Sequence, residues 1–166
     1  MPAGTSLVVA GGDGPPEDAT IATRFHLRSS RDGRTWSSSL AIWLRDPDDG
    51  RWCNATSGGT SFGAPEGGRA RSSPVRGAWT WGGDTVSVER EAAEGHFETV
   101  MAVSGFAAAD VEAIVVDDGS APRRRIQPQP DLGAYAAVAV ATSLTLTPVI
   151  AGRERPERSV VLGIRP

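Results

Sequence analysis

The chain has 166 residues and a formal net charge of −3, and all 17 of its lysine or arginine positions are arginine. The absence of lysine excludes a P-loop, a protein kinase and a pyridoxal-phosphate enzyme, because each depends on a lysine side chain. The charge also lacks the basic excess that is typical of nucleic-acid binding, so no nucleic-acid partner is expected.

The rest of the composition limits the architecture. The 20 glycines and 12 prolines favour many short strands over helices. The single cysteine, Cys53, excludes an intrachain disulfide and a two-cysteine zinc site. The sequence shows no signal peptide, and its most apolar stretch, 134–150, is too short and too polar for a membrane span. We therefore expect a soluble, single β domain over 1–166, with a possible boundary between two lobes near 91–95.

The first part of the chain predicts short strands joined by polar turns. These strands are expected at 7–10, 21–28, 40–44 and 51–55. Turns are expected at 31–34 and 46–50, where aspartate, glycine and proline cluster. Residues 21–28 alternate between apolar and polar, which predicts a half-exposed strand with Arg24, His26 and Arg28 on its outward face.

Two glycine-rich segments interrupt this pattern. Residues 56–73 contain five glycines and almost no apolar side chain, which predicts a long loop of functional or mobile character. Farther along, residues 78–81 and 85–89 predict a second hairpin around Gly82-Gly83-Asp84, because glycine adopts a positive φ without steric cost.

The most informative stretch is 97–119. In 97–103 and in 111–116, apolar side chains fall on both faces of an extended chain. A strand of this kind is expected to be covered on both sides, and its β-branched residues argue against a helix. Asp117-Asp118-Gly119-Ser120 then predicts a hairpin turn. We therefore predict two inner strands of a sheet here.

The remaining chain completes an all-β pattern. Further strands are expected at 123–127, 135–141, 144–150 and 159–164. The run Arg123-Arg124-Arg125 predicts an exposed strand with a solvated face. Short strands with such frequent turns are typical of a sandwich or a barrel. We predict an antiparallel β-sandwich of immunoglobulin-like (Ig-like) type, with a β-barrel as the runner-up.

Three segments between residues 100 and 165 share a strand-and-turn pattern: VSGFAAADVEAIVVDDG, LGAYAAVAVA and SVVLGI. WLRDPDDGRWC in the first half has a similar character. These segments resemble the β-sandwich domains in the extracytoplasmic parts of actinobacterial membrane-associated and regulatory proteins. The resemblance implies a binding or scaffold role and transfers no functional residue. It also implies an extracytoplasmic location, whereas a native start at Met1 without a leader favours the cytoplasm.

Aromatic and basic residues are the candidates for binding. The chain has five tryptophans against one tyrosine. Trp79 and Trp81 share a face of an extended segment, as two rings stacking on successive sugar units would, and Trp43 lies in the earlier hairpin. Packing in or beside the core is the alternative for these rings. Arg24 and Arg28 could together hold an anion, the alternative being a solvated strand face.

Catalytic candidates are sparse. Residues 59–63 match the G-x-S-x-G pattern of a nucleophile elbow, but no apolar strand precedes Ser61 and no convincing helix follows, so a chance match is the better interpretation. His26 is a candidate general base, and His96, Glu98 and Glu112 could form an acid–base group if their strands pair. Two histidines exclude a histidine-rich zinc site, and no metal or cofactor is expected.

Three functions stay open on the sequence. The favoured one is a non-catalytic binding or assembly module that recognises a protein or a carbohydrate partner. The second is a small β-barrel enzyme of cyclase, isomerase or hydrolase type that acts on an apolar metabolite, with 56–73 as its lid. The third is a structural virion or injection-particle protein that assembles as a symmetric oligomer. A homo-oligomer is possible, and no membrane span is expected.

Overall fold

The computed structural model describes residues 6–12, 17–32, 34–63, 78–120 and 122–164. The strands are β1 (Ser6–Gly12), β2 (Ile21–Ser29), β3 (Thr35–Arg45), β4 (Trp52–Gly63), β5 (Thr80–Trp81), β6 (Thr85–Ala93), β7 (His96–Ala107), β8 (Val111–Asp117), β9 (Arg124–Ile126), β10 (Ala134–Val140), β11 (Ser143–Ile150), β12 (Arg153–Glu154) and β13 (Val160–Gly163). All strand pairs are antiparallel, so the predicted all-β antiparallel class is confirmed.

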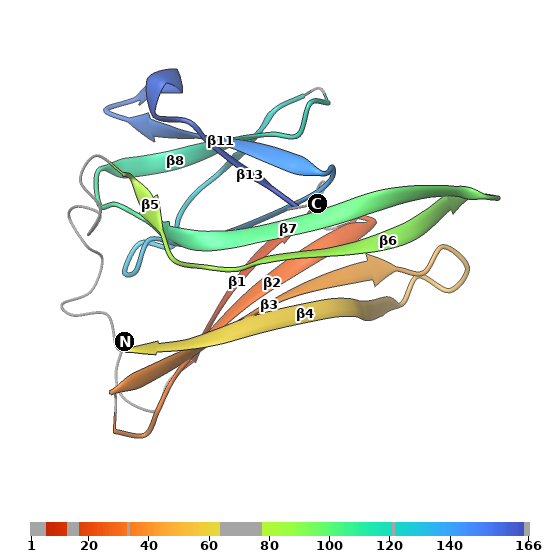
Figure 1. The fold of residues 1–166 in the computed structure, drawn as a ribbon, viewed down its shortest axis with the longest axis horizontal. Helices are drawn as coiled ribbons and strands as arrows, with labels where there is room; N and C mark the ends of the chain where they lie inside the picture. The colour runs from red at the N-terminus through yellow and green to blue at the C-terminus, as the bar shows by residue number, and fades with distance from the viewer. Residues whose placement is uncertain (1–5, 13–16, 33, 64–77, 121, 165–166) are drawn as a thin grey trace.

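These strands form three sheets that lie in layers (Figure 1). The first sheet has the order β1-β2-β3-β4. The central sheet has β7 in its middle, with β10 on one side and both β5 and β6 on the other. The third sheet has the order β12-β11-β8-β9, and β13 also pairs with β11. The described residues include no helix with the length and apolar character needed to cross a membrane.

The central sheet packs between the other two sheets, so most of β7 and β10 is buried on both faces. Alternate residues of β6 and the first residues of β7 are exposed, among them Phe97 at 61 %. On β7, Val100 and Ala102 belong to the core shared with the first sheet, whereas Met101 and Val103 belong to the core shared with the third. The predicted covering of this strand on both faces is therefore confirmed for these four residues. The second predicted inner strand, β8, is also an inner strand, but it lies in the third sheet and does not pair with β7.

Three of the predicted turns join paired strands. The turn at 31–34 connects β2 to β3, the loop at 46–50 connects β3 to β4, and the turn at 117–120 leads from β8 toward β9. In the second of these, the Asp46 carboxylate accepts the backbone N–H of Asp48 at 2.8 Å, which is how aspartate stabilises a tight turn. Residues 91–95, where a boundary between lobes was a possibility, form the end of the β6–β7 hairpin.

The first glycine-rich segment differs from the prediction. Residues 56–63 are not a loop, because they continue β4 in register with β3, and residues 64–73 lie outside the described part of the chain. Glycine suits this strand because β6 passes close to it. A Cβ atom on Gly58 would lie 2.9 Å from Val86 Cγ1, closer than real side chains approach. Glycine at position 58 therefore reflects close packing against the Val86 side chain rather than a loop.

The second glycine-rich segment is not a hairpin. Trp81 pairs with Phe106 and Thr85 pairs with Val103, so the chain continues along the same edge of β7 instead of reversing. Gly82 and Gly83 both have positive φ angles, 59° and 88°. Three residues, 82–84, therefore lie opposite only two residues of β7, 104 and 105, which is the arrangement of a β-bulge. The predicted chain reversal is therefore wrong.

Tyr135, the only tyrosine of the chain, is buried in the core between the central and third sheets. Its hydroxyl forms a hydrogen bond with Thr80 Oγ1 at 2.7 Å, and its ring stacks on Trp79 at 6.2 Å between centroids. Burial of the phenol raises the pKa of Tyr135 to about 12, although the hydrogen bond with Thr80 acts in the opposite direction.

This raised pKa predicts a loss of stability at high pH. The folded state favours the neutral phenol, which therefore stabilises the fold. This stabilisation is fully present below pH 10.0, the pKa of an unfolded tyrosine, and it is lost as the pH rises through about 12. The loss should reach about 3 kcal/mol in the free energy of unfolding. Phenolate absorbance reports Tyr135 alone and can be followed together with circular dichroism. A phenolate transition at pH 10 in a fully folded protein would contradict this prediction.

Candidate functional site

A row of basic side chains runs along the outward face of the first sheet. On β2, Arg24, His26 and Arg28 are exposed, and the residues between them are buried, as the alternation predicted. We call these three residues the basic row. Successive members on one face of a strand are about 6.6 Å apart, so Arg24 and Arg28 are separated by about 13 Å. The row can therefore contact two separate groups of an extended partner.

The strands that carry and flank the basic row contain no acidic residue. His26 pairs with Ser39, which pairs with Gly59, and Arg24 pairs with Ala41. The four strands of the first sheet contain no aspartate or glutamate, although the chain has 20 acidic residues and a net charge of −3. The basic side chains thus stand beside the small residues of β3 and β4 and the exposed Val8 of β1, and no carboxylate within the strands of their own sheet neutralises them.

Arg24 rests on an aromatic ring. Its guanidinium carbon lies 5.0 Å from the centroid of the Trp43 ring. The strand register explains this contact, because Trp43 pairs with Ala22 and is therefore the diagonal neighbour of Arg24. Among the described residues, no ion pair involves Arg24. A guanidinium stacked in this way keeps the donors on its edge available for an anion.

A hollow of about 360 Å³ opens beside Arg24 and Trp43, at one corner of the first sheet. We call it the corner hollow. Its other lining residues are Ala10, Gly11, Gly12, Ala19, Ala22, Thr23 and Trp52. Among the described lining residues Arg24 is the only charged one, and Trp52 is 37 % exposed. Trp43 Nε1 is buried and has no hydrogen-bond acceptor in the described part of the chain.

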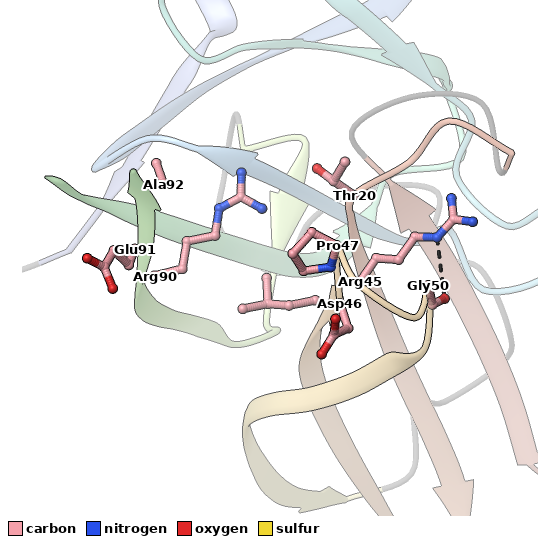
Figure 2. A pocket seen from close by; sticks show the side chains of 9 residues that line it. Thr20, Arg45, Asp46, Pro47, Gly50, Arg90, Glu91 and Ala92 are labelled. Atoms are coloured by element: carbon pink, nitrogen blue, oxygen red, sulfur yellow. Dashed lines mark hydrogen bonds between the residues drawn. The ribbon is translucent and has the colours of Figure 1, made fainter. Parts of the chain in front are cut away.

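A larger hollow of about 580 Å³ lies between the β3–β4 loop and the end of β6 (Figure 2). Its two arginines already have partners. Arg45 donates to the carbonyl oxygens of Gly50 and Glu17, and Arg90 forms an ion pair with Glu98. Asp46 and Glu91 also line the hollow, so cations and carboxylates are balanced there. With its arginines engaged, this hollow is less suited to hold a charged ligand than the corner hollow.

The other predicted binding residues lie elsewhere. Trp79 is 1 % exposed, and its indole donates to the carbonyl of Arg158 at 2.7 Å, so this ring belongs to the core and cannot stack on a sugar from solvent. Trp81 is half-buried and packs against both cores. The alternative of core packing therefore holds for Trp79, and the prediction of a two-ring platform at Trp79 and Trp81 is wrong.

The candidate catalytic residues are not brought together. Exposed His96 begins β7, Glu98 is paired with Arg90, and Glu112 lies on β8 of another sheet, where it accepts the N–H of Gly152. His26 is on the outward face of the first sheet, and neither hollow is lined by a histidine. Within the described residues, no group of three His, Cys, Asp or Glu side chains could hold a metal ion.

The G-x-S-x-G match is likewise not an elbow. Residues 59–63 lie inside β4, paired with β3, where an extended strand replaces the sharp turn that a nucleophile elbow requires. This geometry agrees with the interpretation of the motif as a chance match.

Arg124 is a structural residue that the sequence did not single out. It is half-buried, and its guanidinium donates to the carbonyls of Gly12 at 2.6 Å and Val138 at 2.5 Å. It also forms an ion pair with Asp118 at 3.6 Å. Arg124 thereby ties the third sheet to both other sheets, so the predicted solvated face is wrong for this residue. In a run of three identical residues, the only sequence signal for a buried Arg124 is strand alternation, which places its side chain on the opposite face from Arg123 and Arg125.

The first sheet thus gathers Arg24, Arg28 and Trp43 on one face, with Trp52 at its corner. Chemically, this arrangement offers hydrogen-bond donors and cations to an anion, and an aromatic surface to a ring. Comparison with protein-family models, with curated proteins and with solved structures found no match for this chain.

Proposed function

We propose that the protein is a non-catalytic binding module that recognises a protein or glycan partner through the outward face of its first sheet. One observation carries this proposal: the basic row stands without carboxylates on its sheet, in a chain whose overall charge is negative. Clustered charge of one sign on an exposed surface attracts a partner of the opposite sign and orients it.

The shape of the face supports the same function. Small residues on β3 and β4 leave the backbone open, so an extended partner can lie flat across the strands. The arginines project from this surface, and Trp43 holds one of them in place. A preorganised donor loses less conformational entropy when a ligand binds. The enzyme alternative has no comparable support, because neither hollow contains His26 or His96.

A charge reversal on this face tests the proposal. Arg28→Glu is expected to weaken binding by about tenfold or more, because it replaces an attraction with a repulsion. Arg125→Glu is the matched control, since Arg125 is exposed on β9 of the third sheet and carries the same charge. Binding of wild type and both variants to a panel of immobilised polysaccharides and purified acidic proteins gives the measurement.

Two results would contradict this function. One is a wild-type chain that binds no member of the panel. The other is equal binding by Arg28→Glu and Arg125→Glu, which would show that the outward face of the first sheet is not the surface that recognises the partner.

A further inference from the structure

We infer that the corner hollow binds one carboxylate-bearing sugar ring, and this inference rests on the proposed binding function. Such a ligand has a single negative charge beside a ring with an apolar face and several hydroxyl groups. The described lining residues of the hollow are one charged side chain, two tryptophans and six small residues. Each part of the ligand therefore has a counterpart in the hollow.

The carboxylate is assigned to Arg24. A guanidinium presents parallel N–H donors that match the two oxygens of a carboxylate. The Trp43 ring centroid lies 5.0 Å from the guanidinium carbon, and no described carboxylate forms an ion pair with Arg24. Among the described lining residues Arg24 is the only charged one, so these residues match a single negative charge better than the two charges of a phosphate.

The ring is assigned to the aromatic side of the hollow. Trp52 is 37 % exposed and lines it, so its surface is accessible to the apolar face of a sugar. Facing residues such as Ala10, Gly12 and Ala22 are small enough to admit a ring. A volume of about 360 Å³ is near the lower end for small-molecule pockets, which suits one ring better than a long chain.

The test compares ligands that differ by one group. Glucuronate and glucose share a ring and differ in the carboxylate, while acetate has the carboxylate alone. The five tryptophan indole N–H signals in a nitrogen–proton spectrum report binding, and Trp43→Phe identifies the signal of Trp43. We expect a saturable shift of that signal with glucuronate, and about tenfold weaker binding of both glucose and acetate.

Variants of Arg24 provide the second readout. Arg24→Gln should remove the preference for glucuronate over glucose, Arg24→Lys should restore part of it, and Arg125→Gln should leave it unchanged because Arg125 is on the third sheet. The inference is overturned if glucuronate binds no better than glucose, if acetate binds as well as glucuronate, or if Arg24→Gln keeps the preference. If one of these occurs while binding to the panel still depends on Arg28, the proposed function stands and only the sugar site fails.

Discussion

Replacement of Trp79 by alanine is expected to lower the free energy of unfolding by about 3–5 kcal/mol. The ring is 1 % exposed and fills the core between the central and third sheets, where it stacks on Tyr135. Its indole N–H donates to the carbonyl of Arg158, which links the residue before β5 to the 3₁₀ turn Pro156–Arg158 that precedes β13. Removing the ring therefore leaves a cavity and also takes away a hydrogen bond between segments 79 positions apart in the sequence.

Two further variants divide this effect into its parts. Trp79→Phe keeps most of the ring but removes the donor, so we expect a loss of about 1–2 kcal/mol. Trp52→Ala removes a tryptophan that is 37 % exposed, and the expected loss is below about 1 kcal/mol. Urea unfolding followed by circular dichroism measures all three. If Trp79→Ala cost no more than Trp52→Ala, the assignment of Trp79 to the core would be wrong.

The contrast between Trp79 and Trp43 illustrates what the sequence could predict. Both rings had a binding and a packing interpretation, and neither local sequence decides between them. Trp79 is buried because the third sheet closes over it, whereas Trp43 lies on the outward face because it pairs with Ala22 of β2. Burial of a single ring depends on contacts between strands that are far apart in the sequence, and alternation along one strand contains no information about those contacts.

Alternation was nevertheless sufficient for much of the fold. It gave the outward position of Arg24, His26 and Arg28 on β2, and the two covered faces of residues 100–103 on β7. Both results follow from the two-residue period of a strand, which needs no knowledge of the partner strand. By contrast, the cation–π contact of Arg24 with Trp43 requires the register of β2 against β3, and register is a property of the pair.

Glycine was the least reliable signal. The same residue type supports close packing at Gly58 in β4, a bulge at Gly82 and Gly83, and a hairpin turn at Gly95. In each case glycine is required because a Cβ atom would be too crowded or because φ is positive, and these two causes are indistinguishable in the sequence. The loop predicted over 56–73 was wrong over 56–63, the part that the structure describes, and the hairpin predicted around 82–84 was also wrong, both for this reason.

Comparison of Gly83→Ala with a control variant separates crowding of a Cβ atom from the strain of a positive φ. We expect Gly83→Ala to lower the free energy of unfolding by about 3–4 kcal/mol. Its φ of 88° alone strains any side chain. In addition, a Cβ atom would lie 2.1 Å from the carbonyl oxygen of Ser104 and 2.8 Å from Gly105 Cα, both backbone atoms that cannot rotate away. The bulge would have to open, which would weaken two hydrogen bonds of 2.9 Å. In one the Ser104 N–H donates to the Asp84 carbonyl, and in the other the Asp84 N–H donates to the Ser104 hydroxyl.

Gly95→Ala is the matched control, because Gly95 has a similar φ of 71° but no atom within 4 Å of a new Cβ atom. Its cost should be the backbone strain alone, about 1 kcal/mol. Urea unfolding gives both values, and amide hydrogen exchange at Ser104 locates the damage. Asp84 also accepts a hydrogen bond from Ser38 on β3 at 3.0 Å, so opening the bulge at Gly83 should loosen the contact between the first and central sheets. Equal costs for the two variants would mean that positive φ alone requires glycine at position 83, and that the bulge tolerates a side chain against β7.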